Sequence, residues 1–231
     1  MSESPSLTIV LNARNKQATL AEAVQQIVSI ASYHFPTWEL LLCDNGSTDG
    51  TAAIGDELAA GDPRITVVHF RRRRKLGRVF LDGLQRAQMN RFLFLARPQE
   101  VSPKALDALL SHGERAEIVM LMRADPHGPE PQDDRFLKTI NRLLRLNLRS
   151  LDYTMLLRTA TARAVTVDPR NAIFQTELLV KLLRRGHSCV EVKVAERVGG
   201  RRAKSIKLPS FFGKTRFLWS AFWTMRRRDA E

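Results

Sequence analysis

One stretch, Glu39–Thr51, constrains the fold of this 231-residue chain more than any other. An apolar run, Leu40 to Cys43, ends at Asp44, and a turn rich in Asn, Gly, Ser and Asp follows before a helical pattern opens at Thr51. An unbroken apolar run of this length is typical of a strand buried on both faces of a parallel sheet. The pattern therefore predicts that Asp44 lies at the carboxyl end of a strand, where open α/β sheets form their ligand crevice.

The polar side chains of this turn allow two interpretations. Asp44 and Asp49 can accept hydrogen bonds from a sugar or a base, and the small residues let a ligand approach the backbone. Alternatively, the segment is a plain strand-to-helix turn in which Asp49 caps the helix. The residues of the turn alone do not decide between a ligand site and a cap.

Strand-like and helix-like segments alternate along the first half of the chain. Apolar runs predict strands, and helical periodicity of apolar residues predicts helices. The predicted strands are Leu7–Leu11, Leu40–Cys43, Ile65–Phe70, Phe92–Leu95 and Ile118–Met122, and the predicted helices are Thr19–Ser32, Thr51–Ala60, Gly77–Met89 and Ser102–Leu110. This alternation predicts an α/β fold with a mostly parallel sheet, flanking helices and all strand-end loops on one edge.

The second half of the chain is less regular. A loop with prolines at Asp125–Asp134 precedes a predicted helix at Arg135–Leu151, which carries one apolar and one basic stripe. The basic stripe fits either a solvated face or a face held against anionic lipid or phosphate. A helix at Phe174–Arg185 and a strand at Ser188–Ala195 follow.

The last predicted helix, Pro209–Arg228, carries aromatic residues around most of its circumference and arginines at its end. It is too short and too charged to span a bilayer. It could lie in a membrane interface or dock on the protein's own core. We favour the interface, because so many rings pointing in most directions are difficult to bury on a small domain.

Charge and cysteine content narrow the partners and the compartment. Lys plus Arg is 37 and Asp plus Glu is 24, and the formal net charge of +13 favours anionic lipid, phosphorylated substrates or nucleic acid. The basic run Arg71–Lys75 has no interleaved stacking aromatics, so we do not expect nucleic-acid binding. Cys43 and Cys189 lie in apolar runs and indicate small buried hydrophobes in a reducing compartment. No signal-peptide core or membrane span is evident, so we expect a cytoplasmic, peripherally membrane-associated protein.

The order of these motifs resembles the family 2 glycosyltransferases, which have a Rossmann-like GT-A fold, with the closest likeness to the polyprenyl-phosphate (dolichyl-phosphate) mannose synthase group. The turn is similar to the family's nucleotide-sugar motif D-D-G-S-T-D-G-T, with Asn45 in place of the second Asp. Val10–Leu20 is similar to the opening V-I-P-A-Y-N-E-E-x-x-L, where Asn12 replaces the Pro. The resemblance implies nucleotide binding at Asn15, Asp44, Gly46, Ser47, Asp49 and Gly77.

The main departure from the family follows the strand at Phe92–Leu95. The family has D-x-D there, and those carboxylates hold a divalent metal on the diphosphate; here the segment reads Ala96-Arg97-Pro98. We therefore predict no cofactor, although Mg²⁺ or Mn²⁺ could still bind through another group such as Glu100. Arg97 or the Arg71–Lys75 run could replace part of the metal's charge on the departing diphosphate.

A second candidate catalytic residue, beside Arg97, comes from the helix at Phe174–Arg185. Glu177 stands where the family places a helix-borne Glu beside the site, although a lone Glu could equally be a surface residue. We therefore predict two catalytic residues, Arg97 for its charge and Glu177 because the resemblance implies it.

The acceptor side is closer to the family pattern. Arg123 matches an Arg after the fifth strand, Arg135 and Thr139 match an R-x-x-x-S pattern, and Arg202 and Ser205 fall in an approximate R-x-x-x-G-x-S-K loop. In the family these groups bind a lipid phosphate, and Arg suits this role because it offers paired donors to phosphate.

The resemblance implies a hexosyltransferase that moves a sugar from a nucleotide-sugar to a polyprenyl-phosphate-type acceptor at an anionic membrane surface. It implies a glycosyltransferase 2-like domain at residues 1–208, and residues 209–231 would be the basic aromatic helix in the membrane interface. The alternative is a degenerate, non-catalytic binding or regulatory module, because the D-x-D pattern is missing.

Overall fold

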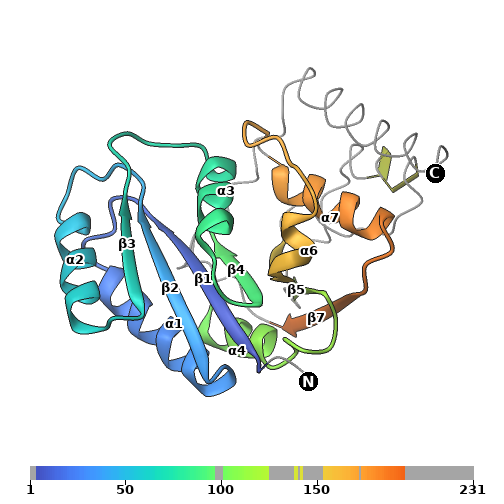
Figure 1. Cartoon of the computed structure of the whole chain (residues 1–231), viewed down its shortest axis with the longest axis horizontal. Helices are drawn as coiled ribbons and strands as arrows, with labels where there is room; N and C mark the ends of the chain where they lie inside the picture. The colour runs from blue at the N-terminus through green and yellow to red at the C-terminus, as the bar shows by residue number, and fades with distance from the viewer. Residues whose placement is uncertain are drawn as a thin grey trace.

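The computed structural model describes residues 4–96, 101–124, 138–139, 141–142, 153–171 and 173–195. Strands and helices alternate along most of these residues (Figure 1). The strands are β1 (Ser6–Ala13), β2 (Thr37–Asp44), β3 (Ile65–His69), β4 (Arg91–Leu95), β5 (Ile118–Ala124), β6 (Thr154–Arg158) and β7 (Cys189–Ala195). The helices are α1 (Leu20–His34), α2 (Thr51–Gly61), α3 (Leu76–Arg86), α4 (Pro103–Leu110), α6 (Thr159–Arg163) and α7 (Phe174–Arg184).

All of these strands form one 7-stranded sheet in the order β3-β2-β1-β4-β6-β5-β7. Neighbouring strands are parallel except that β6 runs antiparallel to both β4 and β5. The predicted α/β fold with a mostly parallel sheet and flanking helices is confirmed. Six strands point the same way, so their carboxyl ends share one edge, which we call the ligand edge.

The reversed strand β6 and the short helix α6 were not among the predicted elements. The apolar run in β6 is only Met155–Leu157, between Thr154 and Arg158, which is too short to stand out as a strand. Its place between β4 and β5 is set by pairing with both neighbours, not by its own pattern.

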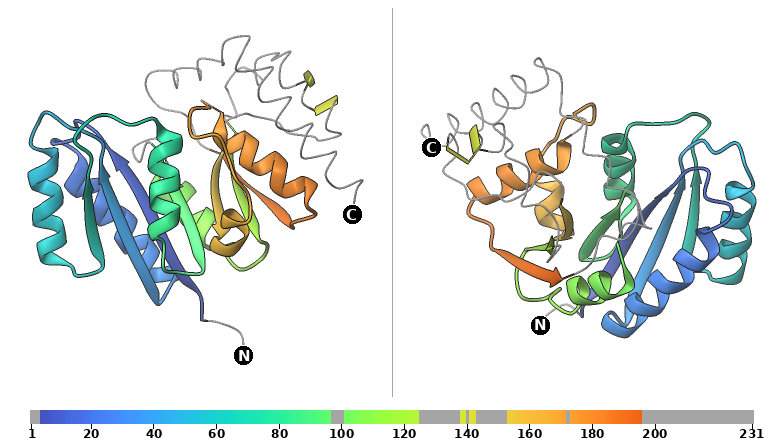
Figure 2. Two further views of the ribbon diagram at one scale, coloured as in Figure 1. Left: turned by 45° about the horizontal axis from the view of Figure 1, so that its top comes forward. Right: turned by 180° about the vertical axis from the view of Figure 1, so that it is seen from behind.

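Helices cover both faces of the sheet and enclose two apolar cores (Figure 2). Alternation along β1 sends Ile9 and Leu11 toward α1 and α4, while Val10 faces α3. Cys43 is fully buried, and desolvation raises the pKa of its thiol to about 12, so the thiol stays protonated. The prediction of a small buried hydrophobe is confirmed for Cys43, whereas Cys189 is half-buried.

Helix α3 ends at Arg86, before the predicted Met89, for a local reason. The backbone N–H of Gln88 donates to Glu39 Oε1 at 2.7 Å, and that of Met89 donates to Thr8 Oγ1 at 3.2 Å. These side chains satisfy amides that would otherwise continue the helix, so the chain can turn directly into β4.

Several predictions fall outside the described residues. These are the loop at Asp125–Asp134, the helix at Pro209–Arg228 and most of the helix at Arg135–Leu151, of which residues 138–139 and 141–142 are helical. The division at residue 208 therefore stays a prediction. In the part of the chain that the structure describes, no helix has the length and apolar character needed to cross a bilayer.

Candidate functional site

The centre of the candidate site is Asp44, the last residue of β2. Asp44 is buried, with 6% of the residue exposed, and its Oδ1 accepts a hydrogen bond from the backbone N–H of Ser47 at 3.1 Å. Its Oδ2 lies 3.5 Å from Nδ1 of His69, at the end of β3. A carboxylate has about four acceptor positions, so Asp44 is oriented by the turn and keeps capacity for a ligand.

The loop after β1 and the turn after β2 are joined by side-chain hydrogen bonds at the ligand edge. The N–H of Asn15 donates to Ser47 Oγ at 3.0 Å, and Asn15 Oδ1 accepts from the N–H of Thr48 at 2.9 Å. Asn15 adopts the left-handed conformation (φ 51°), which Asn tolerates better than most residues. Asn15 and Ser47 therefore lie together as predicted, and their hydrogen bonds join the loop after β1 to the turn after β2.

Asp49 joins the same two loops. Its Oδ2 accepts from the N–H of Gln17 at 3.2 Å, and its Oδ1 accepts from the N–H of Thr51 at 3.0 Å, in the first turn of α2. The hydrogen bond from the Thr51 hydroxyl lowers the pKa of Asp49 and keeps it ionised. The geometry agrees with the capping interpretation of Asp49, from the position before the helix N-cap, Gly50.

The two glycines predicted at the site are required by contacts within the chain. Gly46 has φ +67°, and a Cβ there would lie 2.7 Å from the backbone nitrogen of Arg73. A Cβ at Gly77, in the first turn of α3, would lie 2.6 Å from the carbonyl oxygen of Pro169. Gly46 thus lets the loop between β3 and α3 pack on the Asp44 turn, while Gly77 lets the loop before α7 reach α3.

An amide network, consisting of Asn12 and Asn45, crosses the ends of three strands. Asn45 Oδ1 accepts from the N–H of Arg74 at 2.7 Å, and Asn45 Nδ2 donates to the carbonyl of Arg74 at 3.1 Å and to Asn12 Oδ1 at 2.9 Å. Asn12 Nδ2 donates in turn to the carbonyl of Ala96, after β4, at 3.1 Å. In the sequence, Asn12 and Asn45 stand out only as departures from the family motifs. Two amide side chains at the ends of neighbouring strands are nevertheless a pattern from which this network could have been predicted.

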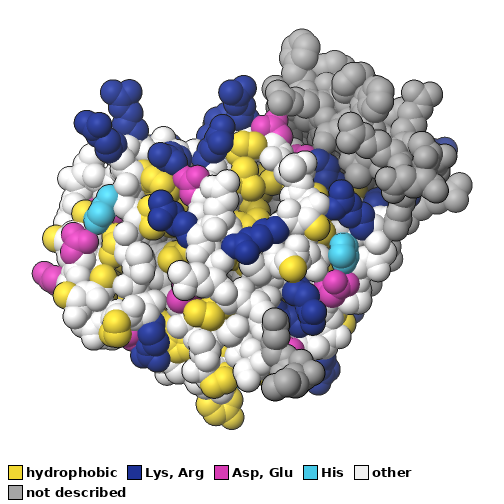
Figure 3. Space-filling model, in the orientation of Figure 1, with side chains coloured by type: hydrophobic (Ala, Val, Ile, Leu, Met, Phe, Trp, Pro, Cys, Tyr) yellow, Lys and Arg dark blue, Asp and Glu magenta, His cyan; other side chains and the backbone are white. Residues whose placement is uncertain are grey.

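The loop between β3 and α3 makes the ligand edge basic. Residues Arg71–Lys75, which we call the basic loop, are all exposed, and Lys and Arg side chains gather along this edge of the molecule (Figure 3). Arg74 forms an ion pair with Asp82 and lies over the ring of Phe70, 4.3 Å from its centroid. Arg74 is therefore the anchor of the loop.

Glu177, a predicted catalytic residue, is buried in the first turn of α7 and is 2% exposed. Its Oε1 pairs with Lys181 Nζ at 2.7 Å, and its Oε2 accepts from Asn171 Nδ2 at 3.0 Å. Lys181 also donates to the carbonyl of Thr166 at 2.9 Å. These contacts brace the loop before α7, so both oxygens of Glu177 are already engaged; Arg97 lies outside the described residues.

The acceptor-side predictions are only partly placed. Arg123 belongs to β5, close to its carboxyl end, and β5 points the same way as β2, so its backbone lies at the ligand edge with Asp44. Thr139 is exposed in a short helical stretch. Arg135, Arg202 and Ser205 lie outside the described residues.

The described residues do not fit the metal that the resemblance implies. Among them, no group of three or more His, Cys, Asp or Glu side chains could hold a metal ion. At the end of β4, Ala96 offers only its carbonyl, which already accepts from Asn12. The carboxylates of Asp44 and Asp49 accept hydrogen bonds from backbone amides of the turn and the neighbouring loop.

The fold is similar to that of solved glycosyltransferases. The structure of glucosyl-3-phosphoglycerate synthase from Mycobacterium tuberculosis, with Mn²⁺, UDP-glucose and phosphoglyceric acid bound, superposes with a TM-score of 0.61 at 20% identity, over 95% of this chain and 79% of that one. At this identity the likeness shows the fold alone, a GT-A-like arrangement.

Sequence comparison adds relatives and a family. The polyprenol monophosphomannose synthase of Mycolicibacterium smegmatis is 29% identical over 194 residues, which cover 75% of this chain and 72% of that protein. EpsE of Bacillus subtilis is 40% identical over 60 residues, so the match spans only 26% of this chain and 20% of EpsE. The model of glycosyl transferase family 2 matches residues 8–231, nearly the whole chain. This protein therefore belongs to glycosyl transferase family 2.

Proposed function

We propose that this protein transfers a sugar from a nucleotide-sugar to a phosphate acceptor. The observation that carries the proposal is Asp44, a buried and oriented carboxylate at the carboxyl end of β2 with acceptor capacity left for a base or ribose. Family membership and the nucleotide-sugar bound in a structure of similar fold support it.

We propose a polyprenyl phosphate as the class of acceptor, presented at an anionic membrane surface. The name of the mycobacterial relative and the place of Arg123 at the ligand edge support this choice. A phosphate nucleophile is already ionised at neutral pH, so the reaction needs no strong general base, in agreement with the paired state of Glu177. The further candidates for binding the phosphate are Arg135, Thr139, Arg202 and Ser205. Residues 209–231 are the candidate segment for contacting the membrane.

A thermal-shift panel of UDP, GDP, CDP and ADP tests the donor site. A bound nucleotide raises the apparent stability by mass action, by about 2.7 kcal/mol at a hundredfold excess over Kd. Asp44→Ala should abolish the shift, whereas Asp107→Ala, which removes an exposed carboxylate paired with His34, should keep it. An unchanged shift in Asp44→Ala would rule out the donor site proposed here.

A second candidate is a non-catalytic module that binds a nucleotide without turnover. The lack of a metal-binding cluster in the described residues and the buried pairing of Glu177 favour it. An assay of transfer from labelled nucleotide-sugars to a polyprenyl phosphate separates the two candidates. Nucleotide binding without transfer or donor hydrolysis, across the whole donor panel, would favour the module.

A further inference from the structure

Three positions at which the chain departs from the family pattern are in direct contact. Asn12, Asn45 and Ala96 stand where the resemblance would place a Pro and two carboxylates, and the amide network links all three. One of these departures removes a carboxylate that would hold a metal, while another creates an attachment for the basic loop. The three departures therefore form one hydrogen-bonded group at the ligand edge.

The contacts of residue 45 require an amide. Its Nδ2 donates to two acceptors, the carbonyl of Arg74 and Oδ1 of Asn12, while its Oδ1 accepts from the N–H of Arg74. A carboxylate at this position could only accept, and it would face the two acceptors without a proton between them. An amide at position 45, and not a carboxylate, can therefore hold the basic loop through both the N–H and the carbonyl of Arg74.

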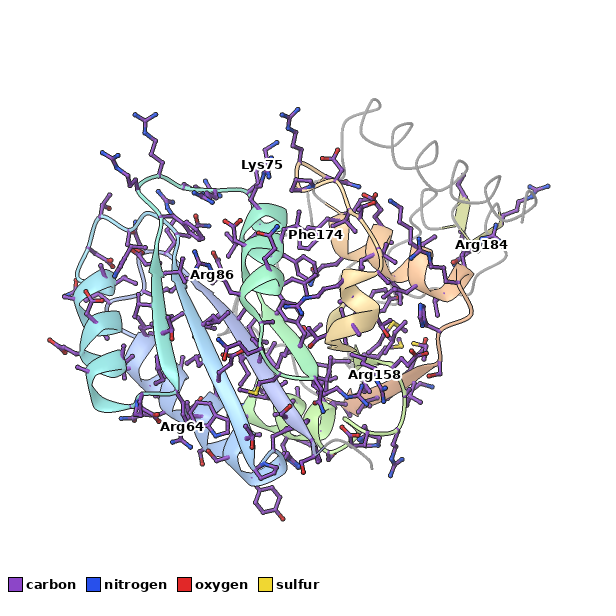
Figure 4. All side chains as sticks on the ribbon, in the orientation of Figure 1. Arg64, Lys75, Arg86, Arg158, Phe174 and Arg184 are labelled. Atoms are coloured by element: carbon purple, nitrogen blue, oxygen red, sulfur yellow. The ribbon has the colours of Figure 1, made fainter. Side chains whose placement is uncertain are left out.

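The anchored loop places positive charge beside the Asp44 turn. The backbone of Arg72 and Arg73 lies against Gly46, and Arg74 is fastened by Asp82 and Phe70. The remaining members of the basic loop are exposed, and among the described residues the structure gives no ion pair to Arg71, Arg72 or Arg73. Lys75 stands at the start of α3 on the same edge (Figure 4).

We propose that the basic loop binds the diphosphate of the donor and supplies the positive charge that a divalent metal would otherwise provide, an inference that rests on the proposed function. In the transfer, an acceptor phosphate oxygen forms a bond to the anomeric carbon. The bond from that carbon to the diphosphate oxygen breaks, and the electron pair leaves on the diphosphate. Arg side chains suit this departing charge because they stay protonated and offer paired donors to phosphate oxygens.

Isothermal titration of the full-length protein with UDP, GDP, CDP and ADP, in EDTA and in Mg²⁺, tests the loop. The wild type should bind with the same affinity in both buffers. The double variant Arg72→Ala/Arg73→Ala should bind roughly tenfold or more weakly, since each charge-assisted hydrogen bond is worth that much. Arg115→Ala removes an exposed arginine at the opposite edge, before β5, and should bind like the wild type.

Asn45→Asp tests the network without changing side-chain volume. It should weaken diphosphate binding in EDTA, and it should also lower the melting temperature without ligand, because a buried carboxylate there would face the carbonyl of Arg74 and Oδ1 of Asn12. If Asn45→Asp unfolds the protein, the double loop variant still decides, because its side chains are exposed.

The results separate failure of the loop from failure of the proposed function. If Mg²⁺ raises the affinity of the wild type tenfold, or if the double loop variant binds like Arg115→Ala, the loop proposal is overturned while the donor site at Asp44 stands. If the wild type binds none of the nucleotides in either buffer, both proposals fall.

Discussion

The two wings of the sheet differ in how their strands are connected. In the N-terminal wing, β1, β2 and β3 are parallel and lie side by side in chain order, each joined to the next by a helix. In the C-terminal wing, chain order is broken, because β6 runs antiparallel between β4 and β5 and β7 pairs with β5. Regular crossovers bring two consecutive loops together, whereas the C-terminal wing reaches the same edge by longer connections.

This difference separates the roles of the wings. The N-terminal wing forms the Asp44 turn from short loops that hydrogen-bond to each other, so the candidate donor site is built locally. The C-terminal wing contributes Arg123 and the braced loop before α7, which touches α3 at Gly77. The junction at α3 and β4 therefore couples the donor side to the candidate acceptor side.

The largest expected effect comes from breaking this junction. Phe80 of α3 packs against Phe92 and Phe94 of β4 and Phe174 of α7, with ring centroids 5.4, 5.5 and 5.2 Å away; Phe174 lies beside α3 in Figure 4. Phe80→Ala should lower the free energy of unfolding by ~3–5 kcal/mol, measured by urea denaturation. Tyr33→Ala, at an 82% exposed aromatic, is the control and should change it by less than ~0.5 kcal/mol. A similar small loss in both variants would show that the wings do not depend on this cluster.

The next effect concerns the brace in the C-terminal wing. Lys181→Met leaves Glu177 buried without its cation. It should lower the free energy of unfolding, measured by urea denaturation, by about 3 kcal/mol. Glu177→Gln keeps an acceptor and the matching shape, so its loss should be smaller. If Glu177→Gln abolished transfer while leaving stability and the Kd for nucleotide unchanged, Glu177 would be catalytic and not a brace.

A smaller effect should follow from altering the turn in the N-terminal wing. Gly46→Ala forces a Cβ into a left-handed conformation and against the backbone of Arg73, and should cost ~1–3 kcal/mol. It should also weaken nucleotide binding, because the basic loop must move. Gly61→Ala, at the end of α2 with no atom within 4 Å of the added Cβ, should be neutral or stabilising by up to ~1 kcal/mol. Equal effects of the two changes on melting temperature would contradict the packing described here.

The smallest effect depends on pH and on His69 in the N-terminal wing. A hydrogen bond to Asp56, with a further contribution from Asp44, raises the pKa of His69 above its ordinary value of 6.5. A raised pKa means that protonated His69 stabilises the fold; this contribution is complete below the pKa of the unfolded chain and is lost as the pH rises through the folded pKa.

His69→Asn should therefore lower the free energy of unfolding by about 0.5 kcal/mol near pH 5.5, a small amount because solvent screens this exposed group. Near pH 9 the loss should be close to nothing, because His69 is then neutral. Urea denaturation at both pH values measures the difference. An equal loss at both would show that His69 acts through packing and not through charge.

Most of the N-terminal wing could be predicted from sequence because its signals are local. The apolar run before Asp44 predicts the strand, and helical periodicity predicts α1 and α2, whose observed bounds differ by only a few residues at each end. Asn15, Asp44, Ser47 and Asp49 were predicted together and do lie together, since parallel strands with right-handed crossovers bring consecutive loops to one edge.

The strand and helix order around Asp44, the family and the basic character of the ligand edge could all be predicted from the order and type of the residues. The place of β6 in the sheet depends instead on long-range contacts, because its short apolar run becomes a strand through pairing with β4 and β5. The same holds for Glu177, which pairs with Lys181 and accepts a hydrogen bond from Asn171, and for Asn45, whose partners Asn12 and Arg74 are distant in sequence. A side chain's type is written in the sequence, but whether it is free for a ligand depends on the partners that folding brings within hydrogen-bonding distance.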